Sequence, residues 1–112
     1  MMKNGEVWLV NFELQVGQEI KNTRPAIIVN DNSLGVLPLK TVVPLTDGTK
    51  EPKSWMVLLK PNQFNGLPNT SFADCFQVKS LSEKRFVKKI GVLTELELAE
   101  VKVSLAKVLG LI

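Results

Sequence analysis

The chain has 112 residues, of which 45% are hydrophobic and 22% are charged, and its net charge at pH 7 is +3. This composition predicts a single folded domain over residues 1–112 and excludes a disordered chain, while the small positive charge permits an anionic partner. The chain contains no histidine, which excludes a catalytic site built on a histidine base.

The cysteine content and the hydropathy pattern exclude further classes of protein. Cys75 is the single cysteine, which excludes an intramolecular disulfide, suits a reducing cytoplasm and, without histidine, argues against a zinc site. No apolar segment approaches 18 residues, and the N-terminus has no signal-peptide pattern. We therefore expect a cytoplasmic protein with no metal, no cofactor and no membrane partner.

Short segments rich in β-branched and aromatic residues alternate with Gly, Pro, Asn and Asp, which is typical of a small barrel or strongly bent sheet. The predicted strands are Gly5–Phe12, Ala26–Val29, Leu39–Leu45, Ser54–Lys60, Thr70–Leu81 and Val87–Leu93. A long polar loop is expected over residues 13–23, and turns over Asn30–Gly35 and Thr46–Thr49. Pro25 has no N–H for a sheet ladder, so we expect it only where its strand begins.

One helix is predicted at the C-terminal end. Thr94 and Glu97 have the spacing of a capping box, and Glu95 favours the positive end of the helix dipole. Apolar residues then follow at helical spacing, namely Leu98, Val101, Leu105, Val108 and Leu109, widened by Leu96, Ala99, Val103 and Ala106. This broad apolar surface either packs entirely on the chain's own sheet or partly meets a second subunit.

Arg24 stands between the polar loop and an apolar strand. A guanidinium fixed at the rim of a rigid sheet is well suited to bind a phosphate through two parallel hydrogen bonds. On the local sequence alone an ordinary surface arginine beside a strand is the favoured interpretation, and the rest of the chain has to support a functional one.

Ordered motifs over almost the whole chain resemble PemK/MazF-type toxins. The segments that carry the resemblance are Gly5–Phe12, Gly17-Gln18-Glu19, Thr23-Arg24-Pro25-Ala26, Val43-Pro44-Leu45-Thr46, Gly66-Leu67, Ser71, Gln77-Val78-Lys79-Ser80, Arg85-Phe86 and Ile90-Gly91-Val92-Leu93. None is diagnostic alone, and the signal lies in their order.

The resemblance implies a fold, an activity and partners. The implied fold is mainly β with α, a small SH3-like barrel of the CcdB/PemK type with a C-terminal helix. The implied activity is that of the toxin of a type II toxin–antitoxin system, a metal-independent, sequence-specific endoribonuclease that cleaves single-stranded mRNA. The implied partners are this RNA, a cognate antitoxin and a second copy of the chain in a homodimer.

Metal-free RNA cleavage uses the ribose 2′-hydroxyl as nucleophile, so the site must accept a proton and stabilise charge on the phosphorane. In the family reading, Arg24 and Thr46 are the catalytic pair, with Arg24 and the Thr46 hydroxyl both donating to the phosphate. Glu19 matches a family carboxylate and is either the base or an organiser of its loop. A solvated glutamate is the plain alternative.

Four further residues are candidates for RNA binding. Gln77 could read a base edge or orient the phosphate, and Ser71 belongs to the same region of the family pattern. Lys79 and Arg85 lie in a basic segment that suits an RNA backbone. Each has an ordinary alternative as an exposed strand or surface residue.

Asp47 follows Thr46 where the family commonly has serine. A carboxylate there would repel the scissile phosphate unless it points away or caps the turn. The departure keeps two alternatives open, a non-catalytic toxin on the same fold that inhibits DNA gyrase, and an inactive module that binds RNA or antitoxin. Retention of both Arg24 and Thr46 favours the enzyme.

Overall fold

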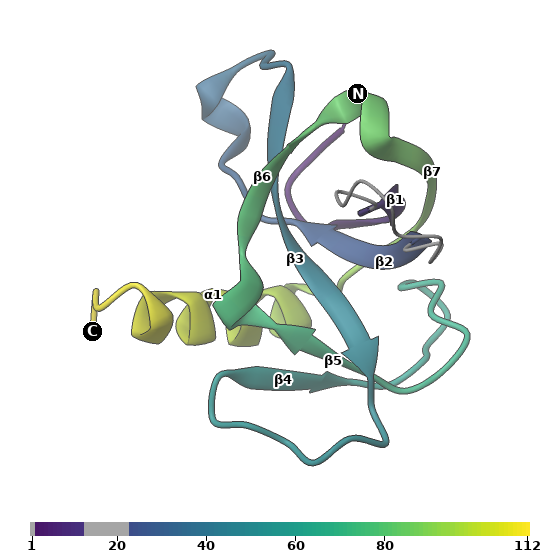
Figure 1. Cartoon of the computed structure of the whole chain (residues 1–112), viewed down its shortest axis with the longest axis vertical. Helices are drawn as coiled ribbons and strands as arrows, with labels where there is room; N and C mark the ends of the chain where they lie inside the picture. Colours follow the sequence, from purple (N-terminus) through teal and green to yellow (C-terminus); the bar gives the residue numbers. More distant parts are fainter. Residues whose placement is uncertain (1, 13–22) are drawn as a thin grey trace, which may run out of the picture.

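The computed structural model describes residues 2–12 and 23–112 of the chain (Figure 1). Seven strands form a sheet in the order β4-β5-β3-β2-β1-β7, and β6 pairs with β3 off this path. The strands are β1 (Glu6–Asn11), β2 (Thr23–Ile28), β3 (Leu39–Asp47), β4 (Met56–Leu59), β5 (Ser71–Asp74), β6 (Lys79–Ser82) and β7 (Phe86–Val92). Three short 3-10 helices connect them, η1 (Asn32–Leu34), η2 (Cys75–Gln77) and η3 (Glu83–Arg85), and α1 (Glu95–Val108) follows β7.

The long strand β3 bends the sheet because it changes partners along its length. Its middle pairs with β2 as far as Pro44, which faces Ala26, and its last three residues pair with β5 instead. Pro25 is the third residue of β2, so the expectation that it would begin its strand was wrong. It pairs with β1 through Leu9 and lies just beyond the last β2–β3 rung, where a missing N–H costs no ladder hydrogen bond.

The predicted continuous strand Thr70–Leu81 is also wrong, because η2 interrupts it between β5 and β6. Both strands pair with β3, but Leu45 faces Ala73 whereas Val42 faces Lys79. Three steps along β3 therefore correspond to six along its partner, and the three extra residues are those of η2. This bulge lifts Phe76 and Gln77 off the ladder, where both are exposed.

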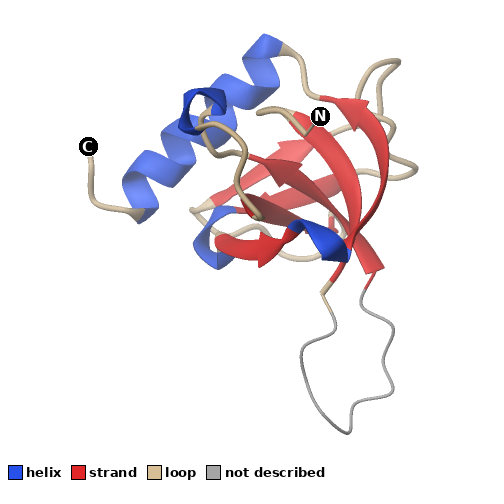
Figure 2. Ribbon diagram, turned by 90° about the horizontal axis from the view of Figure 1, so that it is seen from above, coloured by secondary structure: helices blue, strands red, loops and turns tan. Residues whose placement is uncertain are grey.

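The two faces of the bent sheet carry two separate hydrophobic cores. The helix-side core contains Val7, Ile27, Val43, Leu45, Leu59, Leu67, Ala73, Cys75, Leu93 and Val101. The second core contains Val10, Phe12, Ala26, Ile28, Val42 and Leu81. Neighbouring residues of β2 and β3 alternate between the two cores, as strand geometry requires. Figure 2 shows α1 lying along one side of the sheet.

The predicted helix and its cap are confirmed. Thr94 Oγ1 accepts from the Glu97 amide at 3.2 Å, and Glu97 Oε1 accepts from the Thr94 amide at 2.8 Å. Ser104 Oγ donates to the Trp55 carbonyl oxygen at 2.8 Å and ties the helix to the segment before β4. Burial along α1 concentrates at Val101 and Ser104, so much of the broad apolar surface stays exposed, as at Leu96 and Val103.

We expect Thr94→Ala to lower the free energy of unfolding by about 0.5–2 kcal/mol, because it removes the side-chain half of this capping box. Thr94→Ser keeps the hydroxyl and is the matched control. Urea unfolding at a single protein concentration measures both. Equal stability of the alanine and serine variants would contradict the role of the cap.

The loop between β4 and β5 is held in place by buried polar contacts. Asn65 is fully buried; its Nδ2 donates to the Lys60 carbonyl oxygen and to Glu97 Oε2, and its Oδ1 accepts from the Leu67 amide. Gly66 has a φ of +68° and lies so close to the Ile90 backbone that no side chain fits. These contacts fix the loop whose continuation, residues 68–71, forms a wall of the cleft described below.

The helices of the described part of the chain include none long and apolar enough to span a membrane.

Candidate active site

Three of the predicted site residues line one cleft of about 680 Å³. Arg24 comes from β2, Thr46 from β3 and Ser71 from β5. The other lining residues are Pro25, Leu45, Asp47, Thr49, Lys50, Pro68, Asn69 and Thr70. The cleft therefore opens where β3 leaves β2 and takes β5 as its partner.

The strand register explains why Arg24 and Thr46 meet. Ala26 faces Pro44 in the last β2–β3 rung. Arg24 and Thr46 each lie two residues beyond this rung, on the same face of their strands as Ala26 and Pro44, and both line the cleft. Thr46 in turn faces Phe72 in β5. A guanidinium and a hydroxyl thus share one face of the sheet, at the edge of the second core.

Arg24 is exposed, and it is available for an anion. The ion pairs within the described residues join Lys40 to Glu83 and Lys89 to Glu6, and neither involves Arg24. A guanidinium with no ion-pair partner among residues 2–12 and 23–112 supplies a planar set of donors that matches two phosphate oxygens.

Ser71 has a more structural environment than Thr46. Its Oγ donates to the Asn69 carbonyl oxygen at 3.0 Å, so its proton is already engaged and its oxygen remains as an acceptor. The Gly48 amide donates to the Thr70 carbonyl oxygen at 3.1 Å, and a Cβ at Gly48 would lie 2.6 Å from that oxygen. The turn after β3 is therefore packed directly on the loop before β5, which fixes two walls of the cleft.

Asp47 caps the turn after β3, which is one of the two arrangements named above by which its carboxylate would avoid repelling a phosphate. Its Oδ1 accepts from the Thr49 amide at 2.9 Å, and its carbonyl oxygen accepts from the Lys50 amide at 3.3 Å. The hydrogen bonds from the Thr49 amide and hydroxyl lower the pKa of Asp47, so the carboxylate is charged at neutral pH. It nevertheless lines the cleft, where its charge opposes an incoming phosphate.

The remaining predicted residues do not line this cleft. Gln77 lies on η2 and donates from Nε2 to Asp74 Oδ2 at 2.8 Å. The Lys79 ammonium lies 5.5 Å from the centre of the Phe12 ring, and Arg85 donates to the Asn11 carbonyl oxygen at 3.5 Å. Glu19 lies outside the described residues.

Comparison with known proteins identifies the family. The family model of PemK-like, MazF-like toxins of type II toxin–antitoxin systems matches residues 3–109. The chain belongs to this family. Endoribonuclease MazF9 of Mycobacterium tuberculosis is 30% identical over 106 residues, which are 89% of each chain. Endoribonuclease MazF of Staphylococcus epidermidis is 29% identical over 113 residues, covering 99% of this chain and 93% of the relative.

Solved structures agree with the fold of this toxin. A chain of the MazE–MazF crystal structure from Deinococcus radiodurans superposes with a TM-score of 0.80 at 25% identity, covering 99% of this chain and 97% of that one. A mycobacterial endoribonuclease in complex with its cognate antitoxin gives the same TM-score at 19% identity, covering 100% and 98%. The predicted family, and the predicted β fold with a C-terminal helix, are confirmed.

Several residues that line the cleft of the toxin were not predicted from the sequence. Thr49 and Lys50 follow the Asp-Gly turn, and Asn69 and Thr70 precede β5. Only the proximity of the turn to Thr46 could have indicated Lys50, whose ammonium adds a second cation to the cleft. The asparagine and threonine belong to a loop that no pattern connects with β3.

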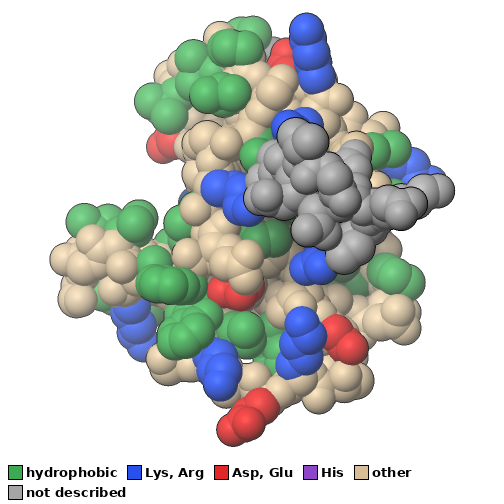
Figure 3. All heavy atoms as spheres, viewed as in Figure 1, with side chains coloured by type: hydrophobic (Ala, Val, Ile, Leu, Met, Phe, Trp, Pro, Cys, Tyr) green, Lys and Arg blue, Asp and Glu red, His purple; other side chains and the backbone are tan. Residues whose placement is uncertain are grey.

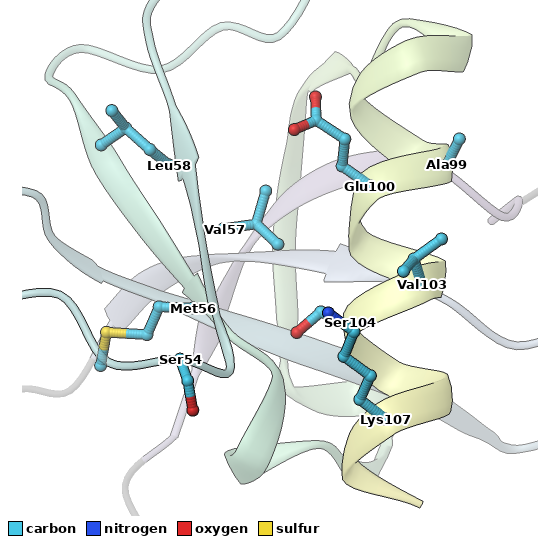
Figure 4. Close-up of a pocket in the computed structure, with 9 residues that line it drawn as sticks. All are labelled: Ser54, Met56, Val57, Leu58, Ala99, Glu100, Val103, Ser104 and Lys107. Carbon is cyan, nitrogen blue, oxygen red and sulfur yellow. The ribbon is translucent and has the colours of Figure 1, made fainter. Parts of the chain in front are cut away.

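A second groove in the toxin lies between β4 and α1 and has a volume of about 460 Å³. Figure 4 shows Met56, Val57 and Leu58 on one side, and Ala99 and Val103 on the helix. Leu58 and Val103 are 46% and 50% exposed. On the face drawn in Figure 3, hydrophobic side chains are spread among Lys and Arg side chains rather than set apart from them.

We expect Asp47→Asn to raise kcat/KM for RNA cleavage about two- to fivefold at low salt, because it removes a like charge from the cleft while keeping an acceptor for the Thr49 amide. The gain should shrink as salt increases. Asp31→Asn is the matched control, because Asp31 Oδ1 caps a turn in the same way, accepting from Ser33 at 2.8 Å, on another part of the surface. An equal gain in both variants would contradict a local effect.

Proposed function

We propose that this MazF-type endoribonuclease toxin cleaves single-stranded mRNA at a short specific sequence, without a metal ion. The observation that carries the proposal is the Arg24–Thr46 juxtaposition in one open cleft, within a chain of this family. The two relatives named above come from two different species, and each is named an endoribonuclease.

The proposed reaction is an internal phosphoryl transfer. The ribose 2′-oxygen loses its proton and bonds to the adjacent phosphorus, and the bond from phosphorus to the 5′-oxygen of the next nucleotide breaks. That oxygen takes up a proton. The products are a 2′,3′-cyclic phosphate on one fragment and a 5′-hydroxyl on the other, so no water is consumed in the step.

Arg24 and Thr46 stabilise the charge that develops in this step. The guanidinium of Arg24 donates two hydrogen bonds to the non-bridging oxygens, and its charge offsets the extra negative charge of the phosphorane. The Thr46 hydroxyl donates to the same phosphate. The Ser71 oxygen, with its proton engaged by Asn69, is left as an acceptor at the edge of the cleft.

The proton acceptor is proposed to be Glu19, from the segment that precedes β2. Arginine stays protonated in proteins, so Arg24 is a poor base. A carboxylate is the remaining ordinary base in a chain without histidine. Asp47 is less suitable because its Oδ1 is committed to the Thr49 amide.

The RNA is proposed to run from the cleft across η2 toward β6. Gln77 is exposed there and suits contact with a base. Lys79 and Arg85 supply positive charge for the backbone, which contributes most of the sequence-independent affinity.

The proposed protein partners are a cognate antitoxin and a second copy of the toxin. The solved relatives include a MazE–MazF complex and an endoribonuclease with its cognate antitoxin. In this chain the half-exposed apolar residues of the β4–α1 groove are suited to a protein surface. We propose that the toxin acts as a homodimer in the cytoplasm, where its mRNA substrate occurs.

Two assays on the wild-type protein separate this function from gyrase inhibition. Discrete fragments from a long single-stranded RNA, with no effect on supercoiling of plasmid DNA by gyrase, are the expected outcome. Inhibition of supercoiling without RNA cleavage would overturn the proposal in favour of a non-catalytic toxin.

A further inference from the structure

Asp74 is the last residue of β5, and its buried carboxyl group accepts unusually few hydrogen bonds from the described residues. The residue is only 6% exposed, and its Oδ1 has no hydrogen-bond partner among the described residues. Its Oδ2 accepts from Gln77 Nε2 at 2.8 Å. A buried carboxylate ordinarily accepts several hydrogen bonds. Among the described residues Asp74 accepts a side-chain hydrogen bond from the exposed Gln77, so we look for its role in what it does to that glutamine.

This contact fixes the orientation of the Gln77 amide. Gln77 Nε2 donates to Asp74 Oδ2, so the NH₂ faces the carboxyl group and the carbonyl Oε1 faces away. Without the carboxylate, the amide would be free to present either end. The residue therefore presents Oε1 as an acceptor and its second Nε2 proton as a donor, in a fixed order, to whatever lies over η2.

Asp74 also connects Gln77 to the cleft. It lies two residues beyond Phe72 on the same face of β5, and Phe72 faces Thr46. The bulge then turns Gln77 outward from that face, next to Phe76, which is 66% exposed. The centre of the Phe76 ring lies 5.4 Å from that of Trp55, so the residue before Gln77 in η2 is an exposed aromatic suited to stacking with a base.

We propose that Asp74 is a positioning residue for base specificity, which fixes the order of the Gln77 amide acceptor and donor toward the edge of one RNA base. Adenine and cytosine present an exocyclic amino donor beside a ring nitrogen acceptor, whereas uracil and guanine present a ring N–H donor beside a carbonyl acceptor. An amide held in one orientation over η2 therefore separates adenine and cytosine from uracil and guanine. This inference rests on the proposed function, because it assumes that RNA crosses η2.

The test uses Asp74→Asn, which keeps the shape of the side chain but allows the Gln77 amide to turn round. The wild-type cleavage sequence is first mapped on a long RNA. Oligonucleotides with each base replaced in turn then give kcat/KM at every position. We expect one position at which the wild type discriminates about tenfold between adenine or cytosine on one side and uracil or guanine on the other, and we expect Asp74→Asn to lose most of that preference.

Two further variants separate specificity from charge and folding. Gln77→Ala should lose the preference at the same position. Asp31→Asn removes an equal charge elsewhere and should keep it. A uniform rise in kcat/KM over all substrates in Asp74→Asn, with the preference intact, would overturn the proposal, as would loss of the preference in Gln77→Ala alone.

A measurement that needs no RNA distinguishes failure of this inference from failure of the proposed function. The side-chain amide protons of Gln77, observed by NMR, should exchange slowly in the wild type and faster in Asp74→Asn. Unchanged exchange would overturn the positioning role. Slow exchange in a protein that cleaves no RNA would instead refute the proposed function, and with it the subsite.

Discussion

Replacing Arg24 by alanine is expected to lower the rate of RNA cleavage about a thousandfold, with little change in stability. A single preorganised donor to a developing oxyanion is worth about 10²–10³ in rate, and Arg24 adds a full positive charge and a second donor. Its side chain is exposed and its contribution to the sheet is made through the backbone, which pairs with Val10. Single-turnover cleavage of a short single-stranded RNA measures the effect.

Arg24→Lys is the matched control for charge. It keeps the positive charge but loses the planar fork, so we expect intermediate activity, about tenfold to a hundredfold below wild type. Urea unfolding of all three proteins tests the expected constant stability. Cleavage by Arg24→Ala within tenfold of wild type would remove Arg24 from the reaction.

Thr46→Val should lower kcat about a hundredfold while KM changes little, because the hydroxyl is proposed to donate mainly to the charge of the transition state. Valine keeps the branched shape of threonine on β3, opposite Phe72, so the strand should be undisturbed. Steady-state kinetics on the same RNA separates kcat from KM.

Thr46→Ser retains the hydroxyl and should stay within about tenfold of wild type. This pair isolates the hydroxyl from the packing of the side chain. If valine and serine variants had equal activity, the hydroxyl of Thr46 would have no part in catalysis.

Much of the fold followed from local pattern. The C-terminal helix was predicted correctly because its signals, the capping box of Thr94 and Glu97 and the helical spacing after it, act within a few residues. Strand positions followed from β-branched runs between turn residues. Where the prediction failed, the cause was pairing with strands distant in sequence: β1 extends β2 back past Pro25 to Thr23, and β3 pairs with both β5 and β6 within Thr70–Leu81.

The candidate site was predictable only in part for the same reason. Arg24 was predicted to bind a phosphate because of its position before a strand, and Thr46 was predicted as a catalytic residue from the family resemblance. Their proximity depends on the β2–β3 register, which sequence pattern did not specify. Lys50 and Asp74 were missed because the features that matter, a shared cleft and a buried unpaired oxygen, exist only in the folded chain.

The central claim is metal-independent cleavage by the 2′-hydroxyl, and the ends of the RNA fragments test it most directly. A defined single-stranded RNA is incubated with the wild-type protein in EDTA, and the new termini are analysed by mass spectrometry. We expect discrete cuts that leave a 2′,3′-cyclic phosphate and a 5′-hydroxyl. Fragments with a 3′-hydroxyl and a 5′-phosphate, or cleavage that EDTA abolishes, would contradict it.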